Sequence, residues 1–226
     1  GKMADKQMDM GERSSVHAIM GAGAADVAQL STCNVEHCSK SLWGMAKAGF
    51  QPPSDITIKL ATAVAERSRE ADPQELSSTL CALAFLGYNP GDSILTKLAR
   101  AVAERRGHAG LTILCDTLWA VATLGCNPGD GFVTKKLAIA VAERYNEAEL
   151  NEVSITVWAL AKLGCDPGPK ALGKLAFAVA QHSGDASPED LSNTLSIVDK
   201  FGCKLDARTL DKLASALASY QTEVTG

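Results

Sequence analysis

Five lysines recur at a nearly constant interval, and together they could contact the phosphates of a nucleic-acid strand. They lie 38 or 39 residues apart, at Lys59, Lys97, Lys136, Lys174 and Lys212. A parallel set of arginines follows the first three lysines, at Arg67, Arg105 and Arg144. Cations repeated along a stack of elements can follow a single-stranded backbone. In the alternative interpretation they are solvated ends of packed helices, offset by Glu66, Glu104 and Glu143.

Apolar residues form a second candidate surface, because they occupy repeat positions that are polar elsewhere in the chain. Ile139 and Phe177 replace polar residues of one helix, and Ile113 and Ile155 replace polar residues of the helix before it. Apolar side chains clustered in adjacent units suggest a protein partner. Alternatively, a slightly rotated helix buries them.

Short polar residues that differ from unit to unit are a third candidate, since a protein that contacts one base per repeat would use them. They are Glu36, Gln74, Thr112, Asn151 and Glu189. Unconstrained surface positions would look the same. Trp43, Trp119 and Trp158 share another repeat position, and we expect them to pack in the core between hairpins.

The sequence gives almost no support for catalysis. Its four histidines share no spacing with carboxylates or a nucleophile, and it contains no glycine-rich phosphate loop or nucleophile elbow. Cys33 and Cys38 flank His37, but no second pair follows at metal-ligand spacing. We therefore expect a protein that is not an enzyme, with no cofactor, metal or small-molecule substrate.

One phrase, beginning LWGMAKAGFQP at Leu42, recurs along most of the chain. Its glycines stand 38 or 39 residues apart, at Gly49, Gly87, Gly125, Gly164 and Gly202. A fixed period in this range indicates a solenoid, in which each unit buries its apolar face against its neighbours. Cys126, Cys165 and Cys203 share one repeat position, too widely spaced for disulfides, so we expect them to be buried apolar side chains.

Each unit has the signals of two antiparallel helices. Asp72-Pro73 and Ser187-Pro188 are helix starts, a glycine such as Gly87 ends the first helix, and Pro90 prevents its continuation. The second helix is rich in alanine, which lets neighbouring units approach closely. The sequence therefore predicts an all-α solenoid of five helix-turn-helix repeats over residues 32–226, with an N-terminal extension or cap at residues 1–31.

Composition limits the classes of protein to which this chain can belong. The 226 residues are 46% hydrophobic and carry a net charge of −4, which is ordinary for a globular protein and unlike the basic balance of a dedicated nucleic-acid binder. No apolar run approaches the roughly 20 residues that a membrane span needs, so we expect no membrane insertion. The N-terminus lacks the features of a secretory signal.

The segments LWGMAKAGFQPP, LWAVATLGCNP and VWALAKLGCDP resemble octotricopeptide repeats, and the likeness covers residues 36–220. The related repeats of FAST-kinase-type mitochondrial proteins are similar. The resemblance implies a helical-hairpin fold, a location in the mitochondrion or chloroplast, and binding of single-stranded RNA in transcript maturation, stability or translation. The alternative is a protein–protein scaffold or accessory subunit of a large organellar complex, such as a ribosome or a photosynthetic assembly.

Overall fold

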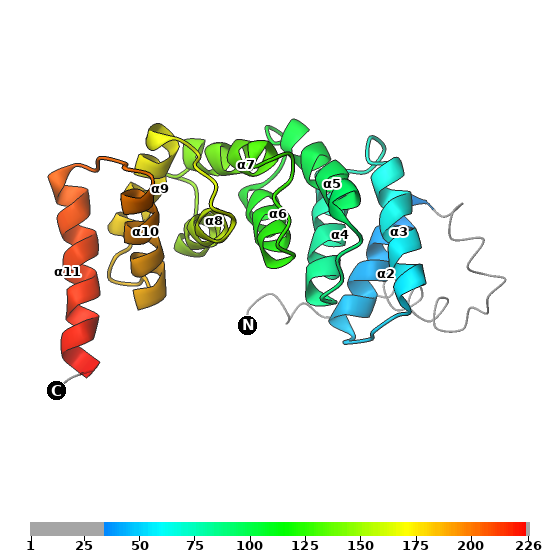
Figure 1. Ribbon diagram of the computed structural model, residues 1–226, viewed down its shortest axis with the longest axis horizontal. Helices are drawn as coiled ribbons and strands as arrows, with labels where there is room; N and C mark the ends of the chain where they lie inside the picture. Colours follow the sequence, from blue (N-terminus) through cyan, green and yellow to red (C-terminus); the bar gives the residue numbers. More distant parts are fainter. Residues whose placement is uncertain (1–33, 225–226) are drawn as a thin grey trace.

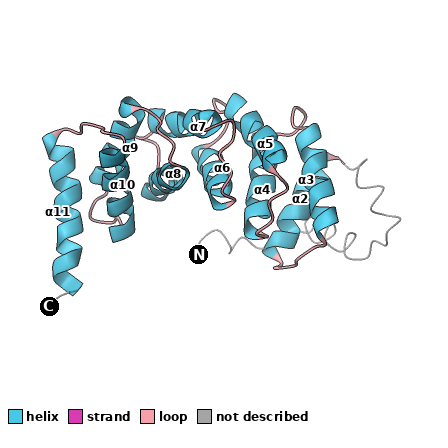
Figure 2. Ribbon diagram, in the orientation of Figure 1, coloured by secondary structure: helices cyan, strands magenta, loops and turns pink. Residues whose placement is uncertain are grey.

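The computed structural model describes residues 34–224, and this part of the chain consists of helices and loops only (Figures 1 and 2). The expected cap at residues 1–31 lies outside the described residues. Ten helices form five consecutive hairpins: α2 (Val35–Lys47) with α3 (Ser54–Glu66), α4 (Pro73–Phe85) with α5 (Asp92–Glu104), α6 (Leu111–Thr123) with α7 (Phe132–Glu143), α8 (Leu150–Leu163) with α9 (Pro169–Gln181), and α10 (Pro188–Lys200) with α11 (Ala207–Val224). The predicted all-α solenoid of five hairpins is confirmed.

The helices form two rows. Each first helix packs against the first helix of the next unit, which makes a first-helix row of α2, α4, α6, α8 and α10. The second helices α3, α5, α7, α9 and α11 form the second-helix row in the same way. Figure 1 shows the rows as an arc, with the second helices along its outer side and the first helices along its inner side. The two rows therefore present two different surfaces to partners.

Local signals fix where the helices begin and end. The Oδ1 atom of Asp72 accepts a hydrogen bond from the Glu75 amide at 2.7 Å, and the Glu75 carboxylate accepts one from the Asp72 amide at 2.8 Å. This reciprocal pair is a capping box, and Ser187 with Asp190 forms another at the second predicted helix start. Gly87 adopts a φ of 65° after α4, which a side chain would disfavour. The predicted helix ends are confirmed.

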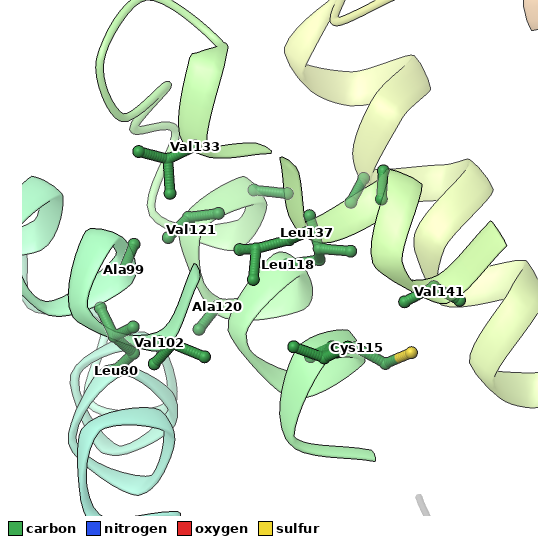
Figure 3. Packing of buried hydrophobic residues seen from close by; sticks show 14 of the residues in the cluster. Leu80, Ala99, Val102, Cys115, Leu118, Ala120, Val121, Val133, Leu137 and Val141 are labelled. Carbon is green, nitrogen blue, oxygen red and sulfur yellow. The ribbon is translucent and has the colours of Figure 1, made fainter. Parts of the chain in front are cut away.

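The core fills the space between the rows. Leu80, Leu118 and Leu137 are fully buried, and fully buried alanines such as Ala99 and Ala120 lie beside them. Figure 3 shows Leu118 and Val121 of α6 packed with Leu137 of α7. Alanine at these positions allows the helices of neighbouring units to approach closely, so each unit depends on the next for burial.

The described cysteines are buried. Cys126, Cys165 and Cys203 are buried as predicted, and no disulfide joins the described cysteines. Burial raises the pKa of Cys115 to about 12 and that of Cys126 to about 11. These thiols therefore stay protonated at neutral pH and act as packing groups.

No described helix is both long enough and apolar enough to cross a membrane. Within residues 34–224, no three histidine, cysteine, aspartate or glutamate side chains gather in a way that would hold a metal ion.

Candidate functional site

Four positions of each first helix, at the helical spacing i, i+4, i+7 and i+11, hold exposed or half-buried side chains, except for the buried Cys81 of α4. In α2 they hold Glu36, Lys40, Trp43 and Lys47, which are exposed or half-buried, while the intervening Leu42 is fully buried. We call these positions, repeated in every unit, the inner stripe. Because the first helices line the inner side of the arc, the inner stripe is the surface that an extended ligand would meet there (Figure 1).

Three aromatic rings on the inner stripe contact one another across three successive units. The ring centroids of Trp43 and Phe85 lie 5.8 Å apart, and those of Phe85 and Trp119 lie 4.9 Å apart. Phe85 is 43% exposed, and both tryptophans are half-buried. The tryptophans pack against the core as predicted, yet each keeps part of its surface exposed. The three rings form a continuous aromatic ladder.

Lysines accompany aromatic rings at the ends of the first helices. The Nζ atom of Lys47 lies 5.7 Å from the centroid of the Trp43 ring, and that of Lys162 lies 4.7 Å from the Trp158 ring. Lys200 ends α10 in the equivalent position. Cations near helix C-termini are stabilised by the helix dipole. We call the aromatic ladder, Trp158 and these three lysines the inner ridge.

Sequence reasoning missed Phe85, although a signal exists. The second unit has Cys81 where the first, third and fourth units carry tryptophan, and its aromatic residue stands four positions later, at Phe85. Positions four apart lie one above the other on a helix. The ring of Phe85 therefore occupies the gap between Trp43 and Trp119.

The predicted lysine column lies on the other row. Lys59 and Lys97 are exposed on α3 and α5. Lys136 lies over the Phe132 ring at 4.5 Å, and Lys174 lies over the Tyr145 ring at 5.5 Å. Lys212 Nζ lies 3.5 Å from the side-chain oxygen of Gln181, to which it donates. The lysine column and the inner ridge therefore cannot act on one strand as a single surface.

The predicted arginine column makes contacts within the chain. Arg105 donates from Nη2 to the carbonyls of Ser68 and Arg69, at 2.9 and 3.0 Å. Arg144 donates from Nη1 to the carbonyl of Ala109 at 2.9 Å, and Arg67 forms an ion pair with Glu70. Arg105 and Arg144 therefore join successive units, because their acceptors lie in the loops that follow the second helices of the preceding units.

Tyr220 makes the corresponding bond in the last unit. Its hydroxyl donates to the carbonyl of Ala186 at 3.1 Å, and Ala186 holds the repeat position of Ala109. A different side chain thus preserves the same contact between units. This conservation of the bond within one chain indicates a structural role for the position.

We expect Arg144→Met to lower the free energy of unfolding by about 1.5–3 kcal/mol, because a charged hydrogen bond is lost and a carbonyl loses its partner. The measurement is urea denaturation followed by circular dichroism. Arg100→Met is the control, since Arg100 is an exposed arginine on the same row. Equal stabilities of the two variants would refute the structural role of Arg144.

The predicted apolar candidates do not form one patch. Ile139 of α7 and Phe177 of α9 lie on the second-helix row, with Phe177 37% exposed. Ile113 of α6 and Ile155 of α8 are half-buried on the first-helix row. The four residues are therefore divided between the two rows. The sequence pattern alone could not show this, because it does not place one helix of a hairpin relative to the other.

Comparisons with protein-family models and with curated proteins found no match for this chain.

Proposed function

We propose that this protein is a non-catalytic helical-repeat protein that binds single-stranded RNA along the inner ridge. The observation that carries the proposal is the aromatic ladder of Trp43, Phe85 and Trp119, with rings 5.8 and 4.9 Å apart. Aromatic side chains are stacking platforms for unpaired bases, each stack contributing about 1–3 kcal/mol. Stacking tolerates any base, because every base has a π face.

Other positions of the inner stripe supply the remaining contacts. The first position holds an exposed polar residue in all five units: Glu36, Gln74, Thr112, Asn151 and Glu189. Polar side chains that differ between units suit the hydrogen-bonding edges of unpaired bases. Lys47, Lys162 and Lys200 suit the phosphates.

The charge of the chain limits how much of the affinity is ionic. The net charge is −4, and the ridge contributes three lysines. Three phosphate contacts on a single strand correspond to a slope of about −2 in log affinity against log salt. The affinity should therefore fall by about an order of magnitude between roughly 50 and 200 mM salt. Base stacking should supply the part of the binding free energy that does not depend on salt.

The test is fluorescence anisotropy with a labelled single-stranded RNA pool, titrated at those two salt concentrations. We expect micromolar or tighter binding with the shallow salt slope given above. Duplex RNA of the same length is the control, because its bases are already stacked and paired. Equal binding of the duplex, or no binding of the single strand at the lower salt, would refute the proposal and favour an accessory subunit of a large organellar complex.

The biological setting follows from the resemblance to octotricopeptide repeats. It supports a location in the mitochondrion or chloroplast and a role in transcript maturation, stability or translation. Five units contact about five nucleotides at one base per repeat, which is too few for a unique transcript. We therefore propose that specificity in the cell also requires a protein partner.

A further inference from the structure

A small apolar cleft opens between α7 and α9 on the second-helix row. Its volume is about 210 Å³. Its apolar lining consists of Ile139 and Ala142 of α7, Pro167 and Pro169 before and at the start of α9, and Ala171 of α9. Ligand pockets for small molecules usually hold about 300–1,000 Å³. The smaller cleft is suited to one or two apolar side chains of a peptide.

The fourth unit opens this cleft by losing side-chain volume. Ala171 stands where the first three units carry Ile56, Ile94 and Val133. Replacing a branched side chain by alanine leaves space that neighbouring helices do not close completely. Pro169 replaces the Asp92 of the second unit, so the wall of the cleft is apolar as well.

Two other clefts on the second-helix row are polar. One lies between α5 and the loop before α7, and its lining includes Asp92, Thr96, Lys97, Arg100 and Asp130. Another lies between α11 and the loop after α9, and its lining includes Ser183, Asp211, Lys212 and Ser215. Ile139 holds the repeat position of Arg100, which lines the first of these polar clefts. The apolar lining thus distinguishes the α7–α9 cleft from these two clefts.

Exposed aromatic surface extends the apolar area. Phe177 of α9 is 37% exposed and lies one turn from Lys174, which lines the cleft. The ring of Phe177 contacts that of Tyr145 edge-on, with centroids 6.0 Å apart. Exposed aromatic groups around an apolar cleft are typical of a protein interface.

The charge around the cleft favours an acidic occupant. Lys170 and Lys174 line it, and Lys136 stands on the same side of α7 as Ile139, because the two are three residues apart. The amines of Lys136 and Lys174 lie over aromatic rings. Of the residues that line the cleft, only Glu143 carries a carboxylate. This local positive excess occurs in a chain of net charge −4.

We propose that the α7–α9 cleft docks a peptide segment of a partner protein, with a large apolar anchor residue in the cleft and acidic residues beside it. The anchor displaces water from Ile139, Ala171 and the prolines. The acidic flanks meet Lys136, Lys170 and Lys174. This second binding surface lies on the row opposite the inner ridge, so the peptide and an RNA strand can be bound together.

The test uses a labelled pool of short peptides with large apolar residues at the centre and aspartates on both sides. Two further pools serve as comparisons, one with lysines in place of the aspartates and one with alanines in place of the apolar residues. We expect the first pool to bind the intact chain about tenfold or more tightly than either comparison pool, the size of a hot-spot contact. No binding of the first pool, or equal binding of the lysine pool, would overturn the proposal.

Substitutions drawn from other units keep the fold and change the cleft. Ala171→Ile restores the side chain of the first two units and fills the cleft, and Ile139→Arg restores that of the second unit. We expect each substitution to weaken the binding of the aspartate-flanked peptide pool about tenfold or more. Lys174→Glu should also weaken it, whereas Lys97→Glu, at the same position of α5, should not.

Circular dichroism melting and RNA binding are measured on the same variants. If a variant keeps its melting temperature and its RNA affinity but loses peptide binding, the substitution has acted on the cleft itself. Retained peptide binding by Ala171→Ile would overturn the proposal. RNA that displaces the peptide would also overturn it, because the two sites would then coincide.

Discussion

Leu118→Ala is expected to lower the free energy of unfolding by about 2–5 kcal/mol, the cost of removing a large side chain from a close-packed core. Leu118 is fully buried in the middle of α6. That helix packs against α4 in the preceding unit, against α8 in the following unit, and against α7 in its own. A cavity at this position therefore weakens two interfaces between units as well as one hairpin.

The measurement is urea denaturation, and Leu210→Ala is the matched control. Leu210 lies on α11 and is 46% exposed, so its truncation should change the stability by less than about 0.5 kcal/mol. If Leu118→Ala lowered the free energy of unfolding as little as Leu210→Ala does, α6 would not lie at the centre of the core.

The repeat pattern predicted the fold well, because the signals that end a helix are local. Gly87 and Pro90 mark one helix end, and Asp72 with Glu75 marks the next helix start. These residues act on amides and carbonyls within a few positions, so a single sequence contains the information. The burial of Cys126 followed from the same register.

The candidate site was harder to predict, because it depends on contacts between units. The pattern of Arg105 and Arg144 is the same whether they contact phosphates or the carbonyls of the preceding unit. Only the offset between neighbouring second helices decides between these possibilities. The exposed surfaces of Trp43 and Trp119 depend in the same way on which side of the first helix faces inward.

Phe85→Ala combined with Trp119→Ala is expected to weaken single-stranded RNA binding by about thirtyfold or more, because two stacking contacts of at least about 1 kcal/mol each are lost. Both rings belong to the aromatic ladder, at 4.9 Å from one another. Anisotropy titration with the single-stranded pool measures the effect. Phe85→Ala alone is informative too, since a side chain that is 43% exposed contributes little to the core.

The salt dependence separates this interpretation from the lysine hypothesis. Stacking is not ionic, so the aromatic variants should lose affinity while the slope against salt stays near that of the intact chain. Lys59→Glu with Lys97→Glu, on the second-helix row, is the control and should change the affinity by less than about threefold if phosphates are held on the inner ridge. The reverse result, a large loss and a flattened slope for the lysine pair with no effect of the aromatic pair, would place the strand on the second-helix row. RNA would then compete with the acidic peptide for Lys136 and Lys174, so that the two ligands would exclude each other.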